Sequence, residues 1–533
     1  MMSTRREFLR AGSLGAAVAA TRGPALLAAK ADSKRKKLAH RRRRIIFNDD
    51  GDDVWNPQAK TPAGFVNVRL KHMLNTQVDT LFYCTTQSFN YFTHHTKIGQ
   101  VFLSCHGPFK HNNMQALIDA GTDPLELAVE YAHKHGIEAV WTLRMNDIHD
   151  AFTPPLWPKW KTDHPDALLG KREDWGRYPP GQQHRWWAGV DFTRDDVRKR
   201  MIELIEEVAK NYDVDAIDLD WLRHPIHFHE TLLGKPVTAK QTALITGLVR
   251  DVRKMLERAG DQRGRPILLS TRVPMTIKHG LYLGTDIETW LKEGLIDLLT
   301  IGGGYVPFTM PSEELVGLGH RHDVPVYPCI SASGMMRRKG YGPGGVYGVE
   351  AWRATGANAF GAKADGVSLF NLFPSPGNQK HNELVGQVFS QIGEPATLAG
   401  TDKLFCIDNG AHLSRCGYIN HVVPYASCLP KPVEPGKALS VTLPVGEDVS
   451  AAKSSTLRIQ TDKPTGLGCS LNGQKLTAAP SPELSKRLCL SWLSAEVKPT
   501  VVKKGSNRFE ARLPQTADKA VALTGLELLV RYG

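Results

Sequence analysis

The sequence predicts an α/β fold, a (β/α)8 TIM barrel, followed by an antiparallel β-sandwich. Between residues 44 and 394, a short apolar run, a polar loop and an amphipathic helical pattern recur eight times, as a barrel requires. No glycine-rich phosphate loop follows the first strand, which argues against a doubly wound open sheet. From about Pro395 onward the helical pattern stops, and short alternating strands separated by turn residues follow.

The eight expected strands are short, rich in β-branched residues and bounded by polar loops. They are Arg44–Phe47, Val78–Cys84, Glu138–Leu143, Ala216–Asp220, Ile267–Thr271, Asp297–Ile301, Val326–Ile330 and Gly366–Phe370. Helices are expected between them where apolar residues recur at helical spacing, as in Leu125–His135, Asp195–Asn211 and Thr242–Ala259. Thr122-Asp123-Pro124 supplies a capping residue and a first-turn proline to the first of these helices.

These patterns divide the chain into four regions. We expect a signal peptide in residues 1–31, a basic linker in 32–43, a catalytic barrel in 44–394 and an accessory β-sandwich in 395–533. Most of the net charge of +13 lies in residues 1–44, so the rest of the chain is close to neutral. The near-neutral remainder gives no support for a nucleic-acid partner. The basic stretch is interpreted as a flexible tether.

The first 31 residues resemble a twin-arginine export signal. Arg5 and Arg6 are followed by Phe8 and Leu9, then by a mildly apolar run and a cleavage-like Ala-Lys-Ala triplet. The resemblance implies export of a folded protein to the periplasm or beyond. No later stretch has the length of a membrane span, and the sequence does not specify an oligomeric state.

The fourth expected strand carries two carboxylates that we place at the centre of the active site. Because side chains alternate along a strand, Asp218 and Asp220 share one face, roughly 6.5–7 Å apart. Asp220 is nearer the carboxyl end of the strand, where barrel enzymes build their active sites, and is the better catalytic candidate. Asp218 is expected one step inside, either as a catalytic group or in a buried pair with Arg144 or Arg272.

Two motifs carry a family resemblance. Asp215-Ala216-Ile217-Asp218-Leu219-Asp220-Trp221-Leu222 is similar to the signature of the family 18 chitinase-like barrels, but leucine stands where that family has its catalytic glutamate. We therefore do not transfer the chitinase mechanism. Together with the run from Ala364 to Asn371, the sequence resembles more closely the glycosyl-hydrolase-like family 10 proteins, over residues 44–392. The resemblance implies a barrel of glycoside hydrolase type, and many members of that family are secreted.

Glycoside hydrolysis requires two carboxyl groups that flank the scissile bond. Asp220 is expected to be the ionised one, because Arg223 and Arg272 would lower its pKa. The acid would come from Asp50, Asp49 or Asp147, with Asp50 preferred, and the less favoured alternative is that the acidic turn after the first strand is a solvated loop. Residues predicted to bind the substrate are Asn48, Asp49, Arg144, Asn146, Asp147, Trp186, Trp187, Trp221, Arg223, His224, Arg272, Tyr305 and Asn371.

The tryptophans are predicted to bind sugar because flat indole rings stack on the apolar faces of sugars, although some are expected to form a small core under their long loop. The function predicted is thus an exported glycoside hydrolase that acts on a poly- or oligosaccharide, without a metal or other cofactor. Two alternatives stay open. One is a metal-dependent hydrolase that uses rim histidines such as His224, His227 and His229 with an aspartate. The other is a non-catalytic carbohydrate-binding barrel.

Overall fold

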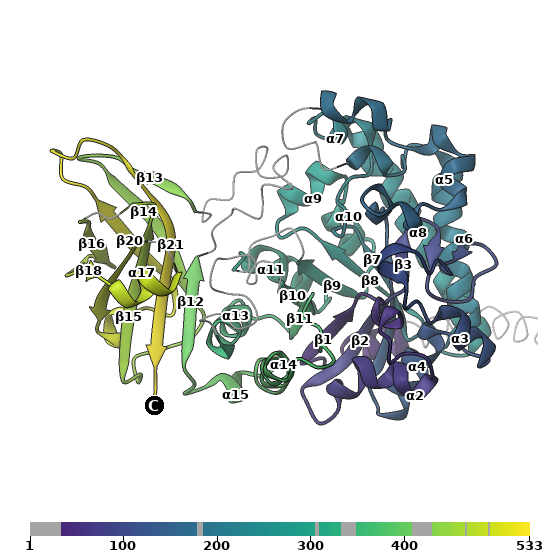
Figure 1. Cartoon of the computed structure of the whole chain (residues 1–533), viewed down its shortest axis with the longest axis horizontal. Coiled ribbons are helices and arrows are strands. Elements are labelled where there is room, and N and C mark those ends of the chain that lie inside the picture. Colours follow the sequence, from purple (N-terminus) through teal and green to yellow (C-terminus); the bar gives the residue numbers. More distant parts are fainter. Residues whose placement is uncertain are drawn as a thin grey trace, which may run out of the picture.

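The computed structural model consists of a barrel and a β-sandwich that lie side by side, joined through helix α13 and strand β12 (Figure 1). It describes residues 33–178, 185–303, 309–331, 348–407, 429–463, 466–488 and 491–533. Within these ranges no helix combines the length and the apolar character that crossing a membrane would need.

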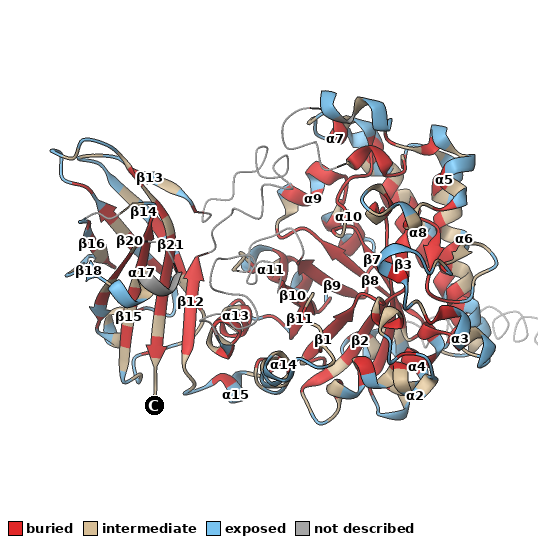
Figure 2. Ribbon diagram, viewed as in Figure 1, coloured by how far each residue is buried: buried red, intermediate tan, exposed pale blue. Residues whose placement is uncertain are grey.

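The barrel is closed by eight parallel strands, as the sequence predicts. In chain order they are β1 (Ile45–Asp49), β2 (Val78–Cys84), β6 (Glu138–Arg144), β7 (Ala216–Asp220), β8 (Leu268–Val273), β9 (Leu298–Gly302), β10 (Val326–Ser331) and β11 (Val367–Phe370). Each strand pairs with its neighbours in sequence, and β1 pairs with β11 to close the ring. The strands are buried along nearly their whole length (Figure 2), which explains their continuous apolar runs.

Helices cover the outside of the ring. They are α2 (Pro62–Val68), α3 (Met114–Asp119), α4 (Pro124–Lys134), α5 (Lys159–Asp163), α6 (Asp195–Asn211), α7 (His229–Leu232), α8 (Ala239–Arg263), α9 (Ile277–Leu283), α10 (Ile287–Lys292), α11 (Glu313–Arg321), α13 (Val349–Gly361), α14 (Gln379–Gln391) and α15 (Pro395–Leu398). Helix α4 begins as expected: the Asp123 carboxylate accepts from two backbone N–H groups of the first turn, and Pro124 occupies the first helical position. In the loop after β2, the short strands β3 (Thr86–Ser88), β4 (Tyr91–Phe92) and β5 (Gln100–Val101) form a small sheet.

The basic stretch before β1 differs from the expected tether. Residues 33–39 form a helix, and Leu38 packs against the apolar layer that fills the amino-terminal end of the barrel interior. The Arg43 side chain is fully buried, and its Nε lies 2.6 Å from Oε2 of Glu138 at the start of β6. The stretch therefore closes one end of the barrel, because its apolar and buried charged groups have partners there.

The carboxyl-terminal part is a sandwich of two antiparallel sheets, as predicted. One contains β12 (Lys403–Ile407), β21 (Val521–Arg531), β15 (Ser454–Thr461), β19 (Ser491–Val497) and β18 (Ala479–Pro480), with β13 (Lys431–Val433) paired to β21. The other contains β14 (Ala438–Val445), β20 (Gly505–Arg512), β16 (Gly468–Leu471) and β17 (Gln474–Leu476). Helix α17 (Pro482–Leu488) precedes β19. Asn472 and Gly473 both have positive φ, which is typical of the tight hairpin turn expected there.

The junction between the two parts is a close backbone contact. Gly361 at the end of α13 packs against Gly446 in the loop after β14, and a Cβ on Gly446 would lie 2.1 Å from the carbonyl oxygen of Ala357. The Gly446 N–H donates to Oδ1 of Asn358 at 2.7 Å. Only glycine at position 446 leaves room for this approach.

Because the stretch before β1 closes one end of the barrel, substitutions at two adjacent arginines should differ in their effect on stability. Substituting Arg43 with Met should lower the free energy of unfolding by about 3–5 kcal/mol, because Glu138 is left as a buried, unpaired charge. The matched control is Arg42→Met. Arg42 pairs with Glu394 but its side chain is 69% exposed, so the loss should stay below about 1 kcal/mol. If urea unfolding gave equal losses of the free energy of unfolding for the two variants, the closure of the barrel end by Arg43 would be contradicted.

Candidate active site

Three charged side chains stand in one row across the carboxyl end of the barrel. Arg144 on β6 is in register with Asp220 on β7, and Asp220 is in register with Arg272 on β8. Residues in register on neighbouring parallel strands point to the same side of the sheet, so the row alternates positive, negative and positive. All three are at most 5% exposed.

Both oxygens of the Asp220 carboxylate have partners. Oδ1 accepts from the backbone N–H groups of Leu222 and Arg223, each at 2.9 Å. Oδ2 forms an ion pair with the guanidinium of Arg272, which also lies 4.4 Å from the centroid of the Phe370 ring on β11. The expected pairing with Arg272 is therefore present, whereas Arg223 reaches Asp220 through its main chain.

Asp218 lies beneath Asp220 in the barrel interior and is 1% exposed. Its Oδ1 accepts from the Ser270 hydroxyl at 2.7 Å. Burial, followed by the negative charge of Asp220, raises the pKa of Asp218 to about 7. The expected ion pair of Asp218 is not what forms, because Arg272 pairs with Asp220, and Arg144 pairs with Asp50 and Asp147.

Asp50 follows β1 and faces the row from the other side of the barrel mouth. Its carboxylate lies 2.9 Å from Nη2 of Arg144 and 3.4 Å from Nη2 of Arg223. Burial alone would raise the pKa of Asp50, but the two guanidinium groups outweigh it and lower the pKa to about 2. Gly51 permits this turn: its φ is +68°, and a Cβ there would lie 1.8 Å from the carbonyl oxygen of Cys84.

None of the three candidates for the general acid both keeps its proton and reaches the barrel mouth. Asp50 is ionised. Asp147 is fully buried, and although burial raises its pKa, the neighbouring His149, His224 and Arg144 hold the pKa well below its ordinary value. Burial raises the pKa of Asp49, but this side chain is fully enclosed and accepts from Arg69 at 2.7 Å. The carboxylates at the mouth are thus better suited to act as anions.

Several predicted binding residues have structural partners in the described part of the chain. The Asn146 amide donates to the carbonyl groups of Val190 and Ile226, at 2.9 and 2.6 Å, and so holds two loops together. Asn48 is 8% exposed, and its amide lies 3.4 Å from the carbonyl oxygen of Phe82. Asn371, at the end of β11, is partly exposed and has φ +58°. Tyr305 lies outside the described residues.

The tryptophans expected to stack on sugars are inside the protein. Trp186 and Trp221 are completely buried and Trp187 is 7% exposed. Trp186 and Trp187 belong to a small apolar core beneath the long loop after β6, together with residues such as Tyr178 and Leu232. Trp221 packs edge-on against His227. In this structure none of the three presents a ring face as a stacking surface.

The histidines group differently from the expected set. His227 is buried between Trp221 and Phe192, and His229 contacts the carbonyl oxygen of Leu169 at 2.6 Å. His224 instead lies beside Asp147, with 3.9 Å between Nδ1 and Oδ2. His149 joins them: its Nδ1 lies 2.8 Å from Oδ1 of Asp147. His149 is not among the residues predicted from the sequence, although it follows Asp147 by two residues in the loop after β6.

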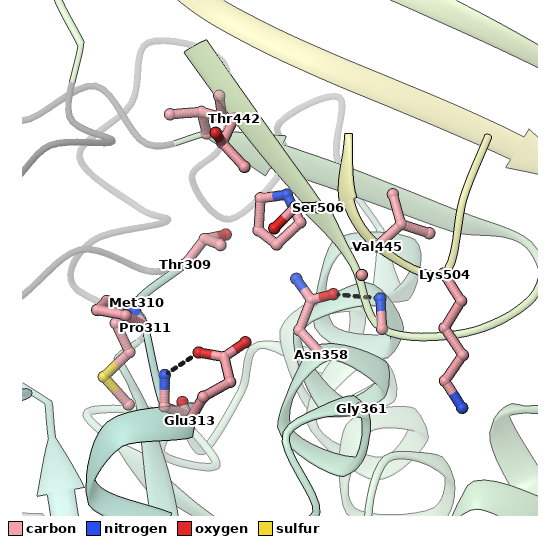
Figure 3. Close-up of a pocket in the computed structure, with 15 residues that line it drawn as sticks. Thr309, Met310, Pro311, Glu313, Asn358, Gly361, Thr442, Val445, Lys504 and Ser506 are labelled. Atoms are coloured by element: carbon pink, nitrogen blue, oxygen red, sulfur yellow. Dashed lines mark hydrogen bonds between the residues drawn. The ribbon is translucent and has the colours of Figure 1, made fainter. Parts of the chain in front are cut away.

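Two hollows lie near these elements. One, of about 500 Å³, separates the loop after β1 from the loop after β11, and its lining includes Asp53, Trp55, Arg69 and Asn371. The other, of about 250 Å³, lies at the junction with the sandwich (Figure 3), lined by residues before α11, on α13 and in the loops of the sandwich. The first borders the acidic turn through Asp52 and Asp53, whereas neither Asp50 nor Asp220 belongs to its lining.

No family model matches the chain, and comparison with curated proteins gives no match. Among solved structures, the PgaB (BpsB) glycoside hydrolase domain from Bordetella bronchiseptica is similar over 66% of this chain and 99% of that chain, with 9% identity and a TM-score of 0.42. A family 18 N-acetylglucosaminidase from Paenibacillus barengoltzii is similar over 65% of this chain and 100% of that chain, with 11% identity and a TM-score of 0.35.

A third structure, the alpha-L-fucosidase isoenzyme 2 from Paenibacillus thiaminolyticus, is similar over 66% of this chain, with 13% identity and a TM-score of 0.38. The match spans only about half, 49%, of the fucosidase chain. At these identities and TM-scores the similarities carry no argument about function, which has to come from the site itself.

The raised pKa of Asp218 predicts how stability depends on pH. Between about pH 4 and pH 7 the unfolded chain loses this proton while the folded protein keeps it, so the free energy of unfolding falls as pH rises. The Asp218→Asn variant has no carboxyl group at this position, so its free energy of unfolding does not fall for this reason. Its stability relative to the natural protein should increase from pH 4 to pH 7, by up to about 4 kcal/mol, and then level off. Parallel denaturation curves across this range would contradict the assignment.

Proposed function

We propose that this protein is a glycoside hydrolase that acts on a poly- or oligosaccharide at the carboxyl end of its barrel. The observation that carries the proposal is the pair formed by Asp50 and Asp220. Asp50 follows β1 and Asp220 ends β7, and Arg223 connects them, since its backbone N–H donates to Asp220 and its guanidinium contacts Asp50. Hydrolysis of a glycosidic bond requires two carboxyl groups at one mouth, and Asp220 and Asp50 supply them, although Asp50 is ionised and does not serve as the acid.

The chemistry follows from where the charge develops. The transition state of glycoside hydrolysis resembles an oxocarbenium ion, and fixed carboxylates stabilise it without having to reorganise. Asp220 acts as the nucleophile or as the base that activates water, because its two oxygens are fixed by backbone N–H groups and Arg272. Asp50 provides the second negative charge. Asp218 supports Asp220 from below, where its uncharged form avoids repulsion.

The low pKa of Asp50 bears on the choice of substrate. With this group ionised, the leaving group receives little help from a carboxylic acid at neutral pH. Glycosides whose leaving group departs without protonation, such as dinitrophenyl glycosides, should therefore react fastest and are the most sensitive probes. The kinship with glycosyl-hydrolase-like family 10 remains part of this proposal, supported by the motifs on β7 and β11.

The rival function is a carbohydrate-binding barrel without catalysis. It is supported less well, because the tryptophans that would provide stacking surfaces are buried. We also propose export by the twin-arginine route to the periplasm or the extracellular space. The support is the arrangement of Arg5, Arg6, Phe8 and Leu9, in a segment outside the described residues.

Replacing Asp220 or Asp50 should abolish turnover, and because each change leaves a buried arginine without its partner, thermal unfolding of each variant is measured beside kcat. Asp220→Asn and Asp50→Asn should each lower kcat by about 10²–10⁴-fold on dinitrophenyl glycosides, measured across a panel of sugars. The control is Asp195→Asn, an exposed residue of α6 that pairs with Lys199, which should leave kcat unchanged. Full turnover by Asp220→Asn would refute the proposed mechanism. Glycan binding without product release by the natural protein would favour the binding barrel.

Export should depend on the arginine pair. Residues 1–43 fused to a folded fluorescent reporter should direct it to the periplasm of a host with a twin-arginine system. Arg5→Lys combined with Arg6→Lys should retain the reporter in the cytoplasm, because the signal is recognised through both guanidinium groups. Cell fractionation measures the distribution. An unchanged distribution in the double variant would exclude this route.

A further inference from the structure

We propose that Asp147, His149 and His224 form a binding site for a divalent metal ion of the zinc class. The site lies in the loops after β6 and β7, beside the Asp50–Asp220 pair. This inference goes beyond the proposed function, because it concerns cation binding and stands whether or not the barrel hydrolyses glycosides. It also departs from the expectation of a metal-free protein.

The spacing of the three side chains is close to that of a zinc site. One ligand atom from each residue lies within 4.8 Å of the other two. Zinc–nitrogen and zinc–oxygen bonds of about 2.0–2.2 Å place tetrahedral ligands roughly 3.3 Å apart. The distances from the Asp147 oxygens are 2.8 Å to Nδ1 of His149 and 3.9 Å to Nδ1 of His224, which lie on either side of that value. Nδ1 of His224 also accepts from the backbone N–H of Ile148 at 3.2 Å, so the His224 ring has to turn when it binds an ion.

The surroundings hold the ligands in place. Asn146 precedes Asp147, and its side chain bridges the backbone at Val190 and Ile226, which ties the loop after β6 to the loop after β7. Nη1 of Arg144 lies 3.2 Å from Oδ2 of Asp147 and orients the carboxylate. Partners of this kind fix the orientation of metal ligands and tune their affinity.

The site opens toward the barrel mouth on the side of His149. The His149 side chain is 32% exposed, whereas His224 is 3% exposed and Asp147 is fully buried. Three protein ligands with an open fourth position are the arrangement that zinc adopts when it binds water or substrate. Arg144 and Arg223 border the site and reduce its affinity for a cation, but both also contact Asp50, which offsets part of their charge.

Metal binding would change the tautomer of one ligand. Nδ1 of His149 is the ring nitrogen that faces Asp147, and a neutral ring that donates to the carboxylate carries its one proton there. A metal ion bound at Nδ1 moves that proton to Nε2, so the neutral ring releases no proton to the solvent. Nε2 lies 3.1 Å from Nη2 of Arg223, so this guanidinium has to turn away when the ion binds.

The test is a calorimetric titration of the metal-depleted full chain with Zn²⁺. We expect one ion per chain, and visible absorption of a four- or five-coordinate site when Co²⁺ is used instead. His149→Gln should weaken binding at least about 10-fold. This position is partly exposed, so the variant should fold, which its thermal unfolding checks.

His106→Gln is the matched control, because His106 is exposed in the loop after β5 and belongs to no such cluster among the described residues. It should bind Zn²⁺ like the natural protein. His224→Gln should also weaken binding. Absence of stoichiometric binding, or equal affinity in His149→Gln and the natural protein, would overturn the site. If the protein binds zinc but cleaves no glycoside, the proposed metal site stands and only the proposed hydrolase activity is refuted.

Discussion

The alternating row Arg144, Asp220 and Arg272 is the constraint on which the barrel mouth depends. A buried charge is tolerated only with a partner, and Asp220 has Arg272 as its partner from the adjacent strand in fixed register. The register that closes the barrel therefore also pairs the charges. Arg144 is shared further with Asp50 and Asp147, so loops after β1 and β6 are drawn to the same point. The ion pairs that hold this end of the barrel together therefore also position the carboxylates proposed for catalysis.

The fold could be predicted because its signals are local. Each strand is a short apolar run, each helix has its own periodicity, and the eightfold repetition admits few other architectures. The shared face of Asp218 and Asp220 was also accessible, since it follows from alternation along a single strand. β1 extends to Asp49, beyond the expected end at Phe47, because pairing with β2 continues to that residue.

The partners of the charged groups could not be predicted in the same way. Asp50 and Arg144 meet only after the barrel has closed, so the sequence around either residue does not indicate the pair. The tryptophans illustrate a related difficulty. Composition alone does not distinguish a stacking surface from a small core, and the loop after β6 resolves this by burying Trp186 and Trp187 beneath itself. Likewise, the high charge of residues 32–43 predicts a flexible tether, but the packing of Leu38 and the buried ion pair of Arg43 hold this stretch against the barrel.

The backbone contact of Gly361 with Gly446 limits how the barrel and the sandwich can move relative to each other. Where two parts of a chain meet through backbone atoms, no side chain can repack to change their separation. The glycine contact therefore sets the distance between α13 and β14, while the ion pair of Arg531 with Glu350 on α13 is a contact across the same junction that salt can weaken. A substitution that adds even a methyl group to Gly446 would act as a wedge and tilt one part against the other.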